Sequence, residues 1–275
     1  MKKRKIYAYA KEWDKMKDLT NGKPLKLIAA FALPILLGNV FQQVYSLTDT
    51  IIIGKTLGNE AIAAGGPTAS VVSLMFSIIN GLVTGFAIIV SKNFGAGRHD
   101  EMRRTIARML TFSAITTAVI ICATTIFIEP LLTALNTPAG IFEQARDYLF
   151  VVALGLVVTL LYNFEAAILR AVGDSVIPLV ILIISTALNI VLDLLFVCVF
   201  NAGVLGAAVA TVAAQLISAV VCLVYLVKKR PFLLVKKSDF KFTKETTAEL
   251  LSAGFGMALM YSIVDMGSIV LQNGI

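Results

Sequence analysis

The sequence is poor in charged residues, in histidine and in cysteine, and each scarcity excludes a class of protein. Charged residues make up only 15% of the 275 residues, whereas 58% are hydrophobic, and the mean hydropathy is +0.86. Ordinary soluble domains lie well below this hydropathy, so we predict an integral membrane protein. The three cysteines, Cys122, Cys198 and Cys222, fall inside hydrophobic runs without the spacing of a metal site.

The sequence motifs of intramembrane enzymes are also missing. A prenyl or glycosyl transferase would need clustered Asp-rich or His motifs at a membrane face, and the chain contains no D-D-x-x-D, H-E-x-x-H or G-x-S-x-G. We therefore predict that the protein is not an enzyme and has no organic cofactor.

Long hydrophobic runs are abundant and define the fold class. A membrane-spanning helix needs about 20 mostly apolar residues. Six complete runs and a seventh that reaches the last residue meet this length: Leu27–Ile53, Ile62–Val90, Ile106–Ile128, Tyr148–Leu169, Val176–Phe200, Val204–Val227 and Ala248–Ile275. We predict an all-α, polytopic membrane protein with a six-helix transmembrane bundle and a seventh helix that starts a second bundle.

The basic residues lie on one side of the predicted membrane. Of the 24 Lys and Arg, all but Lys55 and Arg146 precede the first span, lie between or flank the second and third spans, end the fourth span or follow the sixth. The positive-inside rule then places the N-terminus in the cytoplasm of a cell-membrane protein. This placement also explains the net charge of +7 without a nucleic-acid partner.

The same pattern divides the chain into four predicted segments. Residues 1–24 form a basic cytoplasmic tail, and residues 25–227 form the six-helix bundle. Residues 228–247 form a polar, basic cytoplasmic linker, and residues 248–275 form the first helix of a second bundle.

Four polar side chains on three spans share one depth in the predicted bilayer: Asp49, Asn189, Asp193 and Thr211. At 1.5 Å per residue they lie roughly 6–17 Å from the outer surface. Their carboxylate, amide and hydroxyl oxygens suit a hard cation such as Na⁺, and two carboxylates held close together could instead carry a proton. A third interpretation is that Asp49 and Asp193 only form hydrogen bonds between helices.

Other features within the spans point to helix geometry. Pro34 interrupts the first span, and Gln42, Tyr45 and Asp49 follow at spacings that place them on one helix face. Gly81 and Gly85 have the spacing that lets a neighbouring helix approach closely.

Two further acids fall within or near the spans. Glu165 lies near the predicted cytoplasmic interface, where Arg170 or water can satisfy it, and we favour a structural role over a coupling role. Asp265, in the seventh span, has no predicted role.

Several short motifs occur in an order that resembles one transporter family. They are Phe31-Ala32-Leu33-Pro34, the run from Gln42 to Asp49, Ile53-Gly54-Lys55-Thr56-Leu57-Gly58, Gly95-Ala96-Gly97-Arg98, Arg170-Ala171-Val172-Gly173-Asp174 with Pro178, Leu188-Asn189 to Asp193, and Gly203 to Thr211. Their order and spacing resemble the N-terminal portion of the multidrug and toxic compound extrusion (MATE) family.

The resemblance implies an antiporter that exchanges Na⁺ or H⁺ for organic, often cationic, compounds by alternating access. It implies a cation site at Asp49, Asn189, Asp193 and Thr211, the residues that the depth count selects. It also matches Pro34 and Tyr45, with Gln42 beside them, to positions for substrate contact and for bending of the first helix. Protonation of Asp49 or Asp193 would then shift that helix between kinked and straight forms.

The chain also departs from the family pattern. Family members have twelve spans in two bundles, so we expect a second six-helix half that these 275 residues do not contain. Gly256 stands where a proline is usual. Two alternatives remain open: a flippase for lipid-linked or polysaccharide precursors, disfavoured because the span interiors carry almost no Arg or Lys, and a non-transporting remnant.

Overall fold

The structure, a computed structural model, describes residues 23–57 and 59–273. Within these ranges the side chains of residues 24, 45–46, 49–50, 52–67 and 268–273 lie outside the description. All regular elements of the described chain are helical: α2 (Pro24–Leu57), α3 (Asn59–Gly95), α4 (His99–Ala134), η1 (Ala139–Ile141), α5 (Phe142–Ala171), α6 (Val176–Asp193), η2 (Leu194–Val199), α7 (Gly203–Lys229), η3 (Pro231–Leu233), η4 (Lys237–Asp239) and α8 (Lys244–Asn273).

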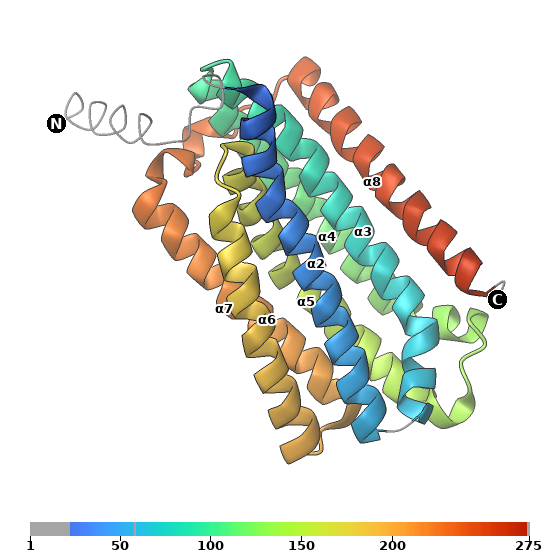
Figure 1. The fold of residues 1–275 in the computed structure, drawn as a ribbon. Coiled ribbons are helices and arrows are strands. Elements are labelled where there is room, and N and C mark those ends of the chain that lie inside the picture. Colours follow the sequence, from blue (N-terminus) through green and yellow to red (C-terminus); the bar gives the residue numbers. More distant parts are fainter. Residues whose placement is uncertain (1–22, 58, 274–275) are drawn as a thin grey trace.

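The predicted fold class is confirmed. Seven helices of the described chain are long and apolar enough to cross a membrane, and they run side by side along one direction (Figure 1). The structure does not test the division into four segments or the cytoplasmic position of the N-terminus, so both remain predictions. The fifth span runs from Val176 to Val199, within one residue of its prediction, but it is not a single α-helix, because α6 stops at Asp193 and a π-helical turn, η2, continues to Val199.

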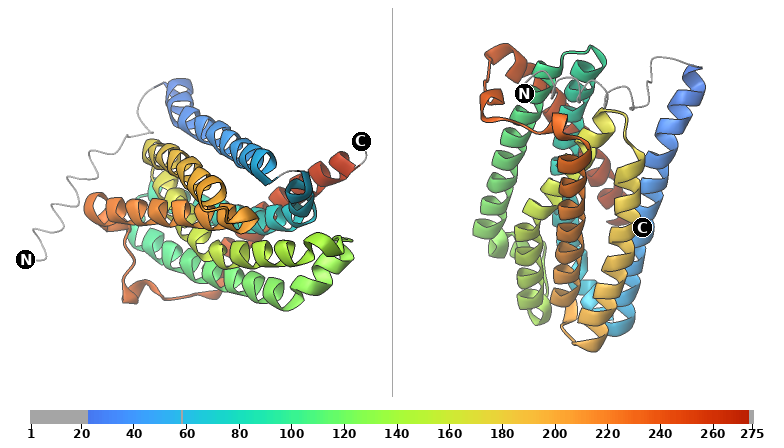
Figure 2. Two further views of the ribbon diagram at one scale, coloured as in Figure 1. Left: turned by 90° about the horizontal axis from the view of Figure 1, so that it is seen from below. Right: turned by 90° about the vertical axis from the view of Figure 1, so that its left-hand side faces the viewer.

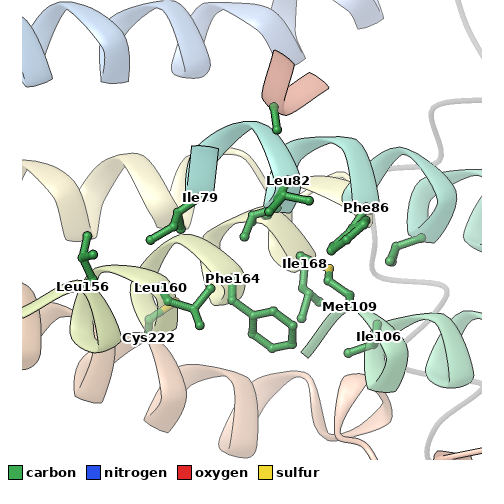
Figure 3. Close-up of a cluster of buried hydrophobic side chains, with 14 of the residues drawn as sticks. Ile79, Leu82, Phe86, Ile106, Met109, Leu156, Leu160, Phe164, Ile168 and Cys222 are labelled. Atoms are coloured by element: carbon green, nitrogen blue, oxygen red, sulfur yellow. The ribbon is translucent and has the colours of Figure 1, made fainter. Parts of the chain in front are cut away.

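The core of the bundle lies between α3, α4, α5 and α7. Buried apolar side chains from these helices form one cluster, seen in close-up in Figure 3: Ile79, Leu82 and Phe86 from α3, Ile106 and Met109 from α4, Leu156, Leu160, Phe164 and Ile168 from α5, and Cys222 from α7. Outward-facing positions carry large exposed apolar residues such as Val119, Ile126 and Val220. An apolar outer surface of this kind is typical of helices that contact lipid.

Helix α2 lies at one edge of the bundle, next to α6 in both views of Figure 2. It also packs against η2, α7 and α3. Gly38 marks the contact with α6, because a Cβ atom added there would lie 3.6 Å from Leu182 and 3.8 Å from Leu179. The first span therefore borders the helices that carry Asn189, Asp193 and Thr211.

Helix α8 packs along α3, and the two glycines identified in the sequence make this contact possible. A Cβ atom added at Gly81 would lie 2.5 Å from the Cα of Ala258, and one added at Gly85 would collide with the backbone of Ala253. Asp265 of α8 is held at the same interface, where its Oδ2 accepts hydrogen bonds from the hydroxyls of Ser73, at 2.9 Å, and Ser77. The close approach predicted from Gly81 and Gly85 is confirmed.

The segment between α7 and α8 is folded against the start of α4. Phe232 and Leu233 of η3 are buried. The carboxylate of Asp239 accepts a hydrogen bond from the backbone N–H of Lys236 at 2.8 Å and lies 3.7 Å from Arg103 of α4. This basic segment and the loop between α3 and α4 therefore lie at the same end of the bundle, as the charge pattern predicts.

Candidate cation site

The candidate site lies where α6 ends and α7 begins. Asn189 and Asp193 are one helical turn apart on α6, so both project from the same face. Asn189 is 2% exposed and Asp193 is completely buried. A carboxylate and an amide therefore face the interior of a hydrophobic bundle, where an ionisable group marks a functional site by default.

Thr211 of α7 joins this face. The Nδ2 atom of Asn189 donates a hydrogen bond to the hydroxyl of Thr211 over 3.5 Å. The amide oxygen of Asn189 is buried and accepts no hydrogen bond from any described residue. The structure thus brings together residues of two spans that the depth count selected, and it leaves the amide oxygen available to a ligand.

Asp49 is the predicted fourth member of the group. Its side chain and that of Tyr45 lie outside the described residues, so the structure does not test the predicted approach of Asp49 to Asp193. Pro34 lies half-buried within α2, which continues as a helix on both sides of it. Gln42 is exposed, and its predicted contact with substrate is likewise not tested.

The π-helical turn η2 is a feature that the sequence did not predict. It begins directly after Asp193 and packs against α2, α6 and α7. In a π turn the backbone hydrogen bonds join residues five apart and not four, which widens the helix. Such turns are frequent at functional sites. Its hydrophobic sequence, Leu-Leu-Phe-Val-Cys-Val, carries no proline, glycine or polar residue that would have indicated it.

The chemistry of the group is that of oxygen ligands. Among the described residues no cluster of three or more His, Cys, Asp or Glu is present, so nitrogen- and sulfur-rich sites of the zinc type are not assembled there. A carboxylate, an amide oxygen and a hydroxyl suit a hard monovalent cation, and the carboxylate alone can carry a proton. The residues present therefore fit either Na⁺ or H⁺.

The structure also reveals polar contacts deeper in the bundle that sequence reasoning missed. The hydroxyl of Thr159 on α5 donates a hydrogen bond to the Oε1 atom of Gln215 on α7. Cys222 of α7 lies close enough to Glu165 to interact with it electrostatically. Of the two predicted partners of Glu165, Arg170 or water, Arg170 forms no ion pair with it among the described residues.

The sequence carried one signal for these contacts. The polar residues of α7 recur every three or four positions, the spacing that collects them on one face of a helix. Only the positions of α5 relative to α7 reveal that this face meets Thr159 and Glu165.

Known proteins resemble the chain in both sequence and structure. Residues 34–195 match the sequence model of the MatE family. "Probable multidrug resistance protein YpnP" of Bacillus subtilis is 30% identical over 261 residues, which cover 93% of this chain and 57% of the relative.

Two solved structures share the fold. Crystal structures of a MATE protein in the bent and in the straight conformation each show 26% sequence identity and superpose with TM-scores of 0.79 and 0.82. The matches cover 86% and 89% of this chain but 53% and 55% of the solved chains. The chain thus spans about half the length of the relatives it matches.

Proposed function

The chain belongs to the MatE family of membrane transport proteins, and on that basis we propose that it acts, with a second six-helix half, as a cation-coupled exporter of organic compounds. The observation that carries the proposal is the buried group of Asn189, Asp193 and Thr211 between α6 and α7. The name of the relative, "Probable multidrug resistance protein YpnP", supports drugs as the transported class, and we propose organic, often cationic, compounds among them.

Asp193 is the coupling residue of this proposal, together with Asp49. A buried carboxylate is stabilised by binding either a proton or Na⁺, because each neutralises a charge that the surrounding hydrocarbon cannot solvate. Asn189 and Thr211 supply the neutral oxygens that complete a cation's coordination. The register of α2 favours Asp49 as the second carboxylate, since it follows Gly38, the contact with α6, by three helical turns.

Helix α2 is the moving element of the proposed mechanism. It lies at the edge of the bundle and contains Pro34, which removes one backbone hydrogen bond and lowers the cost of bending. Cation binding where α2 meets α6 would favour either the kinked or the straight form of α2. A bound cation can shift the equilibrium between the two forms only if it binds one of them more tightly. The existence of bent and straight crystal structures of a relative supports two accessible forms.

The test is drug efflux by this chain co-expressed with the C-terminal half of YpnP, the part that the chain does not match. In everted vesicles, ethidium efflux is expected to depend on an imposed H⁺ or Na⁺ gradient. Asp193→Asn is expected to lower the efflux rate at least about tenfold, a loss of about 1.4 kcal/mol. The matched control is Asp147→Asn, at an acid of α5 whose side chain is 46% exposed and pairs with Arg146.

The control variant is expected to retain the wild-type rate. The proposed function would be contradicted if the ethidium efflux rate depended on neither the H⁺ nor the Na⁺ gradient. It would also be contradicted if the Asp193→Asn and wild-type chains had equal rates.

A further inference from the structure

A row of polar side chains runs along α7 from the candidate cation site toward the basic end of the bundle. Its members are Thr211, Gln215, Ser218, Cys222 and Tyr225, and we name this set the α7 polar row. The alternating spacing of four and three residues places all of them on one helix face. The row covers about 21 Å along the helix axis at 1.5 Å per residue.

The α7 polar row faces the protein and not the lipid. Ser218 and Cys222 are buried, and the other three members are half-buried. On the opposite face of α7, Leu216, Val220 and Leu223 are exposed. Polar side chains that face inward within a membrane span are costly to bury, and they commonly mark ion or proton pathways.

The first three members of the row form hydrogen bonds. Thr211 receives the hydrogen bond of Asn189 at the cation site, and Gln215 accepts one from Thr159 of α5. The hydroxyl of Ser218 donates to the backbone carbonyl of Ala214 at 2.8 Å.

The row ends at a charged cluster beyond α5. The hydroxyl of Tyr225 donates to Asp174 at 3.0 Å, and Asp174 forms an ion pair with Arg230 at 3.1 Å. The cluster lies at the end of α7 that continues into the basic segment after Lys229. The row therefore extends from the candidate site to the predicted cytoplasmic side.

Glu165 lies beside this row, at the level of Cys222. It is 5% exposed, and its Oε2 atom has no hydrogen-bond partner among the described residues. The titratable side chains around it are Cys222 of α7 and Tyr162 of its own helix, while Arg170 lies near Tyr162 and Tyr261. Figure 3 shows Cys222 beside Leu160, within the apolar cluster to which Phe164 also belongs.

The chemistry of Glu165 follows from this environment. An ionised carboxylate without a counter-ion in an apolar interior costs several kcal/mol, whereas the protonated carboxyl costs much less. A cysteine thiol stabilises an adjacent carboxylate only weakly. Glu165 is thus suited to take up a proton and to release it when a neighbouring group or water becomes available.

We propose that Glu165 is a second proton-binding residue and that the α7 polar row carries protons between it and Asp193. In the transfer, the Asp193 carboxyl loses its proton and becomes ionised, while the Glu165 carboxylate gains one proton and becomes neutral. Glu165 then releases the proton toward the cluster of Asp174, Tyr225 and Arg230. The inference rests on the proposed function and deepens it, because it makes H⁺ the coupling ion.

The first test detects the proton on Glu165. Infrared spectra of the purified chain in lipid are recorded between pH 5 and pH 9, and the carbonyl stretch of protonated carboxyl groups is followed. Glu165→Gln is expected to remove one titrating band, whereas Glu143→Gln, at an exposed acid in the first turn of the same helix, retains it. Identical titrating bands in the Glu165→Gln and wild-type chains would overturn the proposal.

The second test measures the route. A pH step is applied only at the side of the α3–α4 loop, and the appearance of the protonated Asp193 band, identified by its loss in Asp193→Asn, is timed. Gln215→Leu, which interrupts the row, and Glu165→Gln are each expected to slow protonation of Asp193 at least about tenfold. Gln144→Leu, at an exposed glutamine of α5, is the control and is expected to match the wild type.

The outcomes separate the two proposals. If the Asp193 band responds to neither H⁺ nor Na⁺ in the wild-type chain, the proposed coupling residue fails and the relay fails with it. If the band responds to Na⁺ but Asp193 never changes its protonation, the relay alone is overturned. If Asp193 protonates at the same rate in the wild-type, Gln215→Leu and Glu165→Gln chains, only the relay is overturned.

Discussion

At the scale of single residues, burial of Asn189 and Asp193 on one face of α6 is the observation from which the mechanism follows. Both side chains are almost fully removed from solvent, and both lie within a helix whose other residues are mostly aliphatic. Burial of such groups is costly unless hydrogen bonds or a bound ion compensate. Thr211 supplies one of these compensating contacts.

The hydrogen bond between Asn189 and Thr211 gives the first prediction. Thr211→Val keeps the shape of the side chain but removes the acceptor of the Asn189 amide. We expect a loss of about 0.6–2 kcal/mol in stability, measured as a lower midpoint of thermal unfolding in detergent. Thr133→Val, at an exposed threonine of α4 whose hydroxyl bonds only to its own helix, should leave the midpoint unchanged; an equal drop in both variants would contradict the assignment.

The sequence predicted which residues lie at the same depth in the bilayer, but not which way their side chains face. Counting along the spans placed Asn189 and Thr211 at a similar level, and the structure shows them in contact. Depth does not reveal which way a side chain faces, so it left the partner of Glu165 open between Arg170 and water, and Arg170 forms no ion pair with it among the described residues. The neighbour of Glu165 is Cys222, which the sequence suggested only as a small apolar residue.

At the scale of the elements, the contact between α3 and α8 depends on small residues. Gly81 and Gly85 face the backbone of α8 directly, and the carboxylate of Asp265 bonds to two serines of α3 nearby. In a membrane, helices associate through close packing and hydrogen bonds because burial from lipid supplies little driving force. The seventh span is therefore attached to the first bundle by close backbone packing, by the hydrogen bonds of Asp265 and by the ion pair of Lys92 with Glu249 at 2.7 Å.

A pair of glycine substitutions tests this packing. Gly85→Ala is expected to lower the thermal midpoint, because the new methyl group collides with the backbone of Ala253. Gly256→Ala, on α8 but with no atom within 4 Å of its added Cβ, should be neutral or stabilising by up to about 1 kcal/mol through helix propensity. The packing assignment is wrong if Gly85→Ala is as stable as Gly256→Ala.

The segment after α7 gives another prediction at this scale. Asp239→Ala removes the acceptor for the Lys236 N–H and the partner of Arg103. We expect faster proteolysis of residues 230–243 by trypsin added at that side of the membrane, since the segment would open more often. Glu245→Ala, at an exposed acid in the first turn of α8, serves as the control; equal cleavage of both variants would show that Asp239 does not hold the segment.

The length and type of the helices were predictable because hydrophobic runs in a membrane protein leave few alternatives. Backbone groups in hydrocarbon must be paired within the segment, so each run becomes a helix. The end of α6 was not predictable in this way. Its π-helical continuation, from Leu194 to Val199, occurs within an unbroken apolar run and depends on packing against α2 and α7.

At the scale of the whole molecule, the chain forms one bundle with α2 and α8 at its margins. Both helices have exposed apolar faces, with residues such as Leu36 and Val40 on α2 and Phe255 and Ile263 on α8. Relatives are about twice as long as this chain. The proposed exporter accordingly needs a second six-helix half to form a substrate cavity.

This requirement can be measured. The 275-residue chain alone is expected to give no gradient-dependent ethidium efflux from everted vesicles, and co-expression with the C-terminal half of YpnP is expected to restore it. The same C-terminal half expressed alone is the control for background efflux. Full efflux by this chain without any partner half would contradict the requirement.

The most direct test of the central claim is the response of the Asp193 carboxyl group to its proposed ligands. Infrared difference spectra of the purified chain are recorded as either H⁺ or Na⁺ is added, and the Asp193 band is identified by comparison with Asp193→Asn. The account predicts that at least one of the two cations changes this band reversibly and that Asp147→Asn leaves the change intact. A band that stays constant through both titrations would contradict the claim that this buried acid binds the coupling cation.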